Sequence, residues 1–253
     1  MTLQVESFGD GPDVVLVHGW GWHGGVWDRC AQELGRTHRV WVPDLPGHRS
    51  NRKVTPHFTL DRLFDALSPS VPQQAIWIGW SLGGLLALTA AQRGMAGKVV
   101  AVGTTPRFVN GTDWACGLPP NWFENFSEEL ALDKQSALER FASLQLGASG
   151  NGRALLRQLR AQLNRCDLPE ADALQGGLSI LKGSDLRAQL PEITAPVLVW
   201  HGESDQIVPV AAGRYLAQAL PHGRFVGVEG AGHAAFLSHP EKFMETVGAF
   251  LRE

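Results

Sequence analysis

Ser81 is the residue most plainly placed to do chemistry. It stands in Gly79-Trp80-Ser81-Leu82-Gly83, a G-x-S-x-G pattern, between a short apolar run of strand type and a helix-forming run, Leu85 to Gln92. A serine at such a turn is held in a strained conformation that exposes its hydroxyl. Glycines on both sides leave room for a sharp bend. The pattern therefore favours a nucleophile over an ordinary turn serine.

A carboxylate suited to work with this serine follows a later strand. Asp205 lies in the loop His201 to Pro209, directly after an apolar run that ends at Trp200. A carboxylate at the carboxyl end of a strand lies at the sheet edge where ligands bind. Asp44 also follows a strand and is its competitor. The chain order serine, aspartate, histidine favours Asp205, and we expect Asp44 to support the turn around Pro46.

His233 is the histidine best placed to act as a base. It lies in a loop of small residues, Gly230 to Ala235, after the last predicted strand. We expect His239 to begin a helix and His18 to support the loop that faces the serine. The remaining histidines are expected on the surface or in loops and show no metal-type spacing; they are His23, His38, His48, His57, His201 and His222.

These three side chains predict acyl transfer through a covalent intermediate. His233 would remove the Ser81 proton, while Asp205 would hold the imidazole tautomer and stabilise the imidazolium. Attack on an ester carbonyl creates an oxyanion, and backbone N–H groups of Leu82 and Trp20 are the expected donors to it. A serine nucleophile argues against dehalogenase or epoxide hydrolase chemistry, which requires a carboxylate.

The elements around these residues alternate between strands and helices. Strands are predicted at 3–8, 14–17, 40–42, 76–79, 98–103, 196–200 and 224–228, and a last helix at 240–251. This alternation predicts an α/β fold with a mostly parallel sheet flanked by helices. Strand signals vanish in residues 112–183, where helical periodicity prevails. We therefore expect a core of residues 1–111 and 184–253 with an inserted all-helical cap.

Composition narrows the class of protein. The 253 residues are 44% hydrophobic with a net charge of −3, which indicates neither a nucleic-acid binder nor a membrane-surface protein. No apolar run reaches the ~18 residues of a membrane span, and the N-terminus lacks a signal-peptide pattern. Three cysteines without metal-type spacing suit a reducing compartment. We expect a soluble, cytoplasmic monomer that needs no cofactor and no metal.

Four longer motifs resemble the α/β-hydrolase family over almost the whole chain. They are Val17 to Gly21, Trp77 to Gly84, Glu139 to Gln145 and Gly176 to Leu181. The last two, in the expected cap, are similar to the family's biotin-synthesis esterases. The resemblance implies hydrolysis of the methyl ester on a pimeloyl chain that acyl carrier protein carries. It also implies a substrate site made of Trp20, Ser81, Leu82, Phe141, Ala142, Ser143, Leu144, Gln145 and His233.

A basic stretch in the expected cap bears on the carrier protein. Residues 133–165 hold six basic and two acidic side chains in a chain of negative net charge. Arg153, Arg157 and Arg160 would share one face of a helix, and with Arg140 they could dock an acidic helix or a phosphopantetheine phosphate. A merely solvated face is the simpler interpretation of the residues alone; the resemblance favours docking.

Two other functions fit the same residues. A generalist short-chain carboxylesterase, or a hydrolase of carbon–carbon bonds, could use the same serine, histidine and aspartate. A ligand receptor on this fold would need only the cleft, and the intact set of three residues argues against it.

Overall fold

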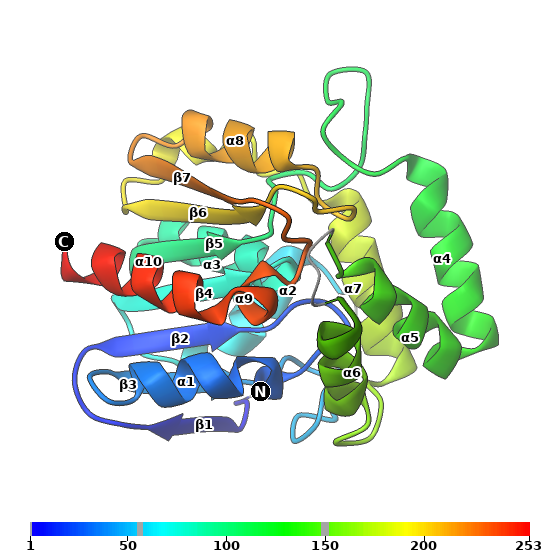
Figure 1. Cartoon of the computed structure of the whole chain (residues 1–253), viewed down its shortest axis with the longest axis horizontal. Helices are drawn as coiled ribbons and strands as arrows, with labels where there is room; N and C mark the ends of the chain where they lie inside the picture. The colour runs from blue at the N-terminus through cyan, green and yellow to red at the C-terminus, as the bar shows by residue number, and fades with distance from the viewer. Residues whose placement is uncertain (1, 55–57, 148–151) are drawn as a thin grey trace.

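The computed structural model describes residues 2–54, 58–147 and 152–253. Its centre is a twisted sheet in the strand order β1-β3-β2-β4-β5-β6-β7, in which β1 is antiparallel to β3 and the other pairs are parallel (Figure 1). The strands are β1 (Val5–Phe8), β2 (Asp13–Val17), β3 (Arg39–Pro43), β4 (Ala75–Trp80), β5 (Ala96–Val102), β6 (Val197–Gly202) and β7 (Gly223–Val228).

The central strands form because their side chains are apolar on both faces. Residues 14–17 of β2 and 197–200 of β6 are completely or almost completely buried. Near-continuous apolar runs of this kind are typical of parallel strands that helices cover on both sides. The predicted α/β fold with a mostly parallel sheet is therefore confirmed.

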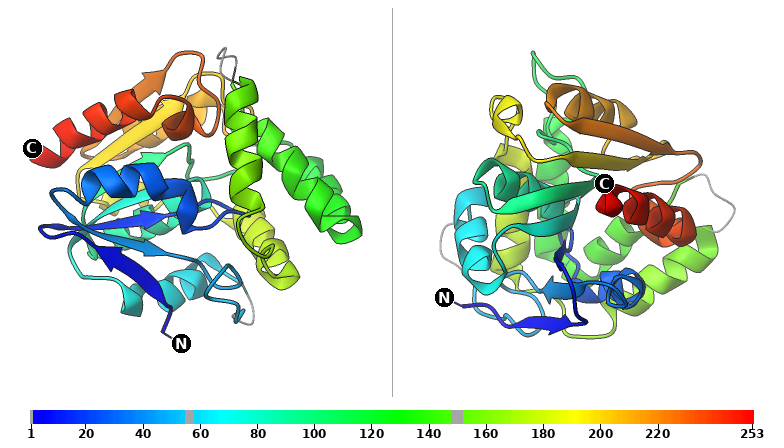
Figure 2. Two further views of the ribbon diagram at one scale, coloured as in Figure 1. Left: turned by 60° about the horizontal axis from the view of Figure 1, so that its bottom comes forward. Right: turned by 90° about the vertical axis from the view of Figure 1, so that its left-hand side faces the viewer.

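Helices cover both faces of the sheet. Helices α1 (Asp28–Leu34) and α10 (Pro240–Arg252) lie side by side on one face, and α2 (Leu60–Leu67) and α3 (Leu82–Gln92) cover the other (Figures 1 and 2). Helix α8 (Val210–Ala219), which packs on β6 and β7, had no counterpart among the predicted elements. Short helical turns complete these layers: η1 (Gly24–Trp27), η2 (Ser68–Ser70), η3 (Leu190–Glu192) and α9 (Ala235–Ser238).

Helices α4 (Pro120–Leu132), α5 (Lys134–Leu144), α6 (Gly152–Leu163) and α7 (Ala171–Gly183) lie together at one end of the sheet (Figure 1). They contact the loops that follow the strands. The Trp20 ring, in the loop after β2, meets the rings of Phe126 on α4 and Phe141 on α5 edge-on, at centroid distances of 5.5 and 5.0 Å. The predicted boundaries of the cap, 112 and 183, stay a prediction.

An ion-pair network joins the two connections between this helical group and the sheet. Arg107 and Asp113 belong to the first connection, and Asp185 and Arg187 belong to the second. Asp113 pairs with Arg107 at 3.0 Å and with Arg187 at 2.7 Å, and Arg187 pairs with Asp185 at 2.7 Å. Exposed pairs contribute little singly, but here four charges hold both connections together.

Backbone atoms of β2, β4 and α3 lie in close contact at the turn after β4. Ser81 has φ of 56°, a left-handed conformation that is strained for a residue with a side chain. A Cβ on Gly79 would lie 2.1 Å from the Gly83 carbonyl oxygen, and one on Gly83 would lie 2.3 Å from the Val17 oxygen. Only glycine lets β2, β4 and α3 approach this closely.

We expect Gly79→Ala to lower the free energy of unfolding by about 3 kcal/mol, because backbone atoms of the turn cannot move aside for the added methyl group. Urea unfolding measures the difference from the unmodified protein. Gly183→Ala is the matched control, since a Cβ there meets nothing within 4 Å, and its effect should stay below about 0.5 kcal/mol. Equal stabilities of the two variants would contradict the tight-turn account.

Candidate active site

Ser81 is fixed by its backbone at the junction of β4 and α3. Its N–H donates to the Val102 carbonyl at 2.9 Å, and its own carbonyl accepts from the Thr104 hydroxyl at 2.8 Å. Both partners come from β5 or the residues just after it. The serine is only 4% exposed. The strained backbone and the hydrogen-bonded carbonyl of Ser81 together set the direction of its side chain.

Asp205 is buried after β6 with each carboxylate oxygen occupied. Oδ1 accepts the N–H groups of Ile207 and Val208 at 2.8 and 2.9 Å, and Oδ2 lies 2.7 Å from Nδ1 of His233. Burial by itself would raise the pKa of Asp205. The charge of His233, its hydrogen bond to the carboxylate and the nearby His201 ring outweigh it and hold that pKa well below its usual range. The carboxylate therefore stays ionised.

His233 is oriented by partners at both ends. Because an ionised carboxylate only accepts, Nδ1 carries the proton that the ring donates to Asp205. The backbone carbonyl of His233 accepts the Trp80 indole N–H at 3.0 Å, and the two rings lie 5.6 Å apart. Trp80 directly precedes Ser81, so the nucleophile and the histidine loop are joined. The ring is 1% exposed, and its Nε2 has no hydrogen-bond partner among the described residues.

His18 supports the loop that lies against Ser81. Its Nε2 accepts the Leu45 N–H at 2.9 Å, so the proton sits on Nδ1, which donates to the Gly19 carbonyl at 2.8 Å. In a trans peptide the Trp20 N–H points opposite to that carbonyl. A Cβ on Gly19 would lie 3.4 Å from the Ser81 Cβ. His18 therefore supports this loop, which is the role that the sequence predicted for it.

Asp44 is engaged in a different task from Asp205. Its Oδ1 accepts the Gly24 N–H at 2.7 Å, and its Oδ2 lies 3.7 Å from the Arg49 guanidinium. The Asn51 amide donates to the Asp44 carbonyl at 2.7 Å. These contacts fix the loops after β2 and β3, in keeping with the turn-supporting part expected of Asp44.

The end of α5 lies between the Trp20 loop and the histidine loop. Phe141 meets Trp20 edge-on, and the Trp20 indole donates to the Leu174 carbonyl of α7 at 2.8 Å. The Gln145 carbonyl accepts the Ala234 N–H at 3.3 Å, next to His233. Of the other residues in the proposed substrate site, Ala142 is buried, and Ser143 and Leu144 are half-buried.

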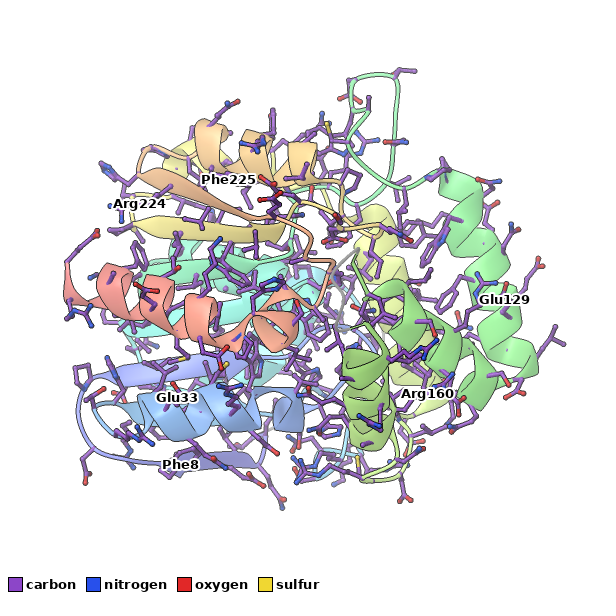
Figure 3. The ribbon with its side chains drawn as sticks, viewed as in Figure 1. Phe8, Glu33, Glu129, Arg160, Arg224 and Phe225 are labelled. Atoms are coloured by element: carbon purple, nitrogen blue, oxygen red, sulfur yellow. The ribbon has the colours of Figure 1, made fainter. Side chains whose placement is uncertain are left out.

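Helix α6 has a buried face of leucines and an exposed face of arginines. Leu155, Leu159 and Leu163 are buried. Arg153, Arg157 and Arg160 are exposed, and none of the three pairs with a carboxylate of the described residues (Figure 3 labels Arg160). Arg140 differs from them, because it pairs with Glu129 of α4 at 2.9 Å. The three arginines share one exposed face, as their spacing predicted.

Three residues near the site were not singled out from the sequence. Thr104 and Trp80 tether Ser81 and His233 through backbone groups. His201 was expected on the surface or in a loop, and this is wrong: it lies in β6, fully buried, with Nε2 3.4 Å from Asp205 Oδ2. Its position just before the aspartate loop is the signal that could have revealed it. His57 lies outside the described residues.

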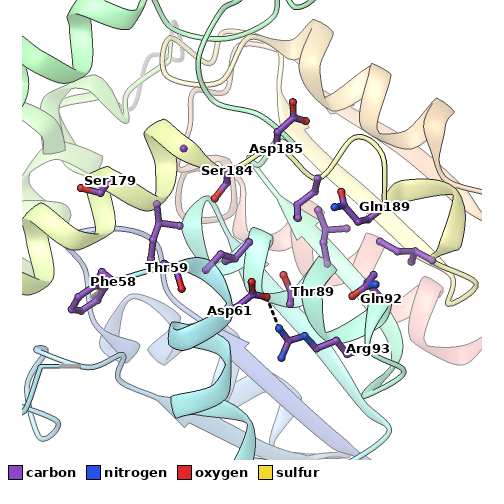
Figure 4. Close-up of a pocket in the computed structure, with 16 residues that line it drawn as sticks. Phe58, Thr59, Asp61, Thr89, Gln92, Arg93, Ser179, Ser184, Asp185 and Gln189 are labelled. Carbon is purple, nitrogen blue, oxygen red and sulfur yellow. Dashed lines mark hydrogen bonds and ion pairs between the residues drawn. The ribbon is translucent and has the colours of Figure 1, made fainter. Parts of the chain in front are cut away.

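A cavity of about 520 Å³ lies apart from Ser81, between α2, α7 and the far end of α3 (Figure 4). Arg93 at its edge forms ion pairs with Asp61 and, at 2.7 Å, with Asp65.

Across the parts of the chain that the structure describes, no group of three His, Cys, Asp or Glu side chains could hold a metal ion. No helix in those parts is long and apolar enough to cross a membrane.

Residues 14–246 match the model of the alpha/beta hydrolase family, and the chain belongs to that family. The fold agrees. An esterase from Exiguobacterium antarcticum superposes with a TM-score of 0.86 at 22% identity, covering 99% of this chain and 96% of that one. A bromoperoxidase from Bacillus anthracis does so with a TM-score of 0.88 at 23% identity, covering 98% and 95%.

Closer relatives share one name. A protein of Nitrosomonas europaea, named pimeloyl-[acyl-carrier protein] methyl ester esterase, is 38% identical over 98% of this chain and 99% of its own. Proteins with that name from Xanthomonas oryzae and Nitrosospira multiformis are 38% and 34% identical, over 98% and 100% of this chain and 98% and 99% of theirs. The resemblance inferred from the motifs is therefore confirmed.

We expect stability to fall with pH below about 6.5 because of two buried histidines. Burial lowers the pKa of both His18 and His48 to about 3. Between pH 3 and 6.5 the unfolded chain binds protons that the folded chain does not, so the free energy of unfolding decreases as pH falls. The slope has a ceiling of about 1.4 kcal/mol per pH unit for each histidine.

Urea unfolding at pH 7.5 and 5.5 measures this effect. His48→Gln should reduce the difference between the two pH values, whereas His222→Gln, which changes an exposed histidine, should leave it as it is. Equal stability of the unmodified protein at both pH values would show that these rings are protonated in the folded state.

Proposed function

We propose that this chain is a serine carboxylesterase that hydrolyses the methyl ester of a pimeloyl chain carried on acyl carrier protein, in biotin synthesis. The products are pimeloyl-acyl carrier protein and methanol. The observation that supports this most is the 2.7 Å hydrogen bond between Asp205 and His233, whose carbonyl accepts from Trp80, the residue before the strained Ser81. The shared name of relatives that match nearly the whole chain supports the substrate.

The reaction proceeds in two steps through an acyl-enzyme. Nε2 of His233 takes the Ser81 proton while Oγ attacks the ester carbonyl, and Asp205 stabilises the imidazolium. The tetrahedral intermediate collapses, and methanol leaves with the proton from His233. Water then attacks the acyl-enzyme with His233 again as base, which releases the free carboxylate and restores Ser81.

Two backbone N–H groups stabilise the oxyanion. Leu82 begins α3, so its N–H has no acceptor within the helix, and the positive end of the helix dipole lies there. The Trp20 N–H is directed by the hydrogen bond from His18 to the Gly19 carbonyl. Loss of one such donor typically costs about 3–4 kcal/mol in the transition state.

The helical group α4–α7 acts as the cap over this chemistry. Ser81 is 4% and His233 1% exposed, so the site lies beneath the surface. Trp20 and Phe141 provide an apolar wall for the acyl chain, and Gln145 lies where the cap meets the histidine loop. We assign residues 112–183 to the cap, and residues 1–111 and 184–253 to the core.

The exposed face of α6 docks the carrier protein. Its guanidinium groups, on Arg153, Arg157 and Arg160, have no carboxylate partner among the described residues and so retain their charge for a phosphate or an acidic helix. Arg140 contributes less, because Glu129 already neutralises it. The enzyme works as a monomer in the cytoplasm, where its three unpaired cysteines stay reduced.

Ser81→Ala should reduce methanol release from pimeloyl-carrier methyl ester by roughly 10,000-fold or more, because no acyl-enzyme can form. Mass spectrometry of the carrier species measures the turnover. Labelling by an active-site phosphonate should disappear in the same variant. Hydrolysis that continues at the original rate without Ser81 would refute the mechanism.

Arg153→Ala combined with Arg157→Ala should raise KM for the carrier substrate by about thirtyfold, since each charged contact to a phosphate or carboxylate contributes on the order of 1 kcal/mol. Turnover of a p-nitrophenyl ester should stay unchanged. Arg36→Ala combined with Arg252→Ala removes two exposed arginines elsewhere and is the matched control. Equal effects of the two double variants on the carrier substrate would argue against a docking face on α6.

A further inference from the structure

His201 is a second histidine at the carboxylate of Asp205. It belongs to β6, just before the loop that carries the aspartate, and its side chain is completely buried. Its Nε2 lies 2.8 Å from the Val208 carbonyl oxygen and 3.4 Å from Oδ2 of Asp205. That same Oδ2 atom is the acceptor for Nδ1 of His233. Two imidazole rings therefore converge on one carboxylate oxygen.

The contacts fix which nitrogen of His201 carries the proton. A carbonyl oxygen can only accept, so Nε2 must be the protonated atom for its 2.8 Å contact with Val208. Nδ1 has no hydrogen-bond partner among the described residues. A Cβ on Gly213 of α8 would lie 2.5 Å from Nδ1, so the helix backbone closes that side of the ring. The N–H dipole therefore points toward the acid loop.

Other charges near the pair are already balanced. Glu203, in the same loop as Asp205, pairs with Arg214 of α8 at 3.3 Å and also approaches Gly227 of β7. The loop of His233 is tied to the acid loop by the Ser204 N–H, which donates to the Ala231 carbonyl at 2.8 Å. The groups facing Asp205 Oδ2 from these elements are thus His233 and His201.

We propose that His201 is a positioning residue for the proposed reaction: its Nε2–H donates to the Val208 carbonyl, and the positive end of this N–H dipole, 3.4 Å from Oδ2 of Asp205, offsets part of that oxygen's negative charge. This inference rests on the proposed esterase function. The same N–H holds the Val208 carbonyl, so one side chain sets both the course of the acid loop and the carboxylate. Asp205 then holds the His233 imidazolium less strongly than an unshared carboxylate would, and His233 more readily returns its proton to the leaving group.

A matched pair of variants tests the proposal. The amide nitrogen of His201→Gln can reach the position of Nε2, whereas that of His201→Asn is too short to do so. The acid limb of the pH dependence of kcat/KM reports the free-enzyme histidine, and a p-nitrophenyl ester keeps carrier docking out of the measurement. We expect the limb to move up by about half a pH unit in His201→Asn and to stay in place in His201→Gln.

These outcomes distinguish a positioning role of His201 from a purely structural role. A purely structural histidine would lower the amount of folded enzyme without moving the limb, so an unmoved limb in folded His201→Asn overturns the proposal. Equal movement in both variants also overturns it. His222→Gln, which changes an exposed histidine, is the control and should leave the limb unchanged.

Nitrogen-15 spectra of the histidines in the unmodified protein give a test that needs no variant and no activity. A proton on Nε2 of His201 supports the proposal, and a proton on Nδ1 overturns it, because the N–H would then face α8. If the unmodified protein hydrolyses no ester, the proposed function fails, and these spectra alone decide whether His201 orients the carboxylate.

Discussion

The buried charge of Asp205 is the constraint on which the rest of the site depends. A carboxylate this far from water is stable only when donors surround it, and here the N–H groups of Ile207 and Val208 and the His233 ring provide them. The parallel sheet makes this possible, because it brings the loops after β4, β6 and β7 to one edge. The acid loop is also tied to the histidine loop through Ser204.

Close backbone packing fixes the position of Ser81 relative to Asp205 and His233. The β4 turn works only with glycines where strand, helix and loop touch, and Trp80 and Thr104 tie the serine to the histidine loop and to β5. The contacts of α5 and α7 are similarly close: a Cβ on Gly177 would lie 2.5 Å from the Trp20 ring, and the carbonyl of Gln145 accepts a hydrogen bond from the histidine loop. Gly177 thus sets how closely α7 approaches the Trp20 loop.

Much of the fold could be predicted because its signals are local. Apolar runs predict the central strands, and each candidate residue follows a strand, so Asp205 and His233 could be expected at one edge. The sequence patterns did not predict the features that depend on side-chain packing between distant segments. Helix α8 is short and includes Gly213, which the His201 ring requires in place of a better helix former. The apolar run of β6 ends at Trp200 while the strand continues to Gly202, so the apolar pattern alone placed His201 in the loop after the strand.

The most direct measurement is the turnover of Asp205→Asn on an ester substrate, made beside a thermal melt that shows the variant is folded. In this variant the amide oxygen would accept the N–H groups of Ile207 and Val208, so the NH2 group would face His233. The ring would then settle in the wrong tautomer, and its imidazolium would lose its counter-charge. The account predicts a fall in kcat of about 10,000-fold. A folded Asp205→Asn enzyme with kcat within tenfold of the unmodified protein would contradict it.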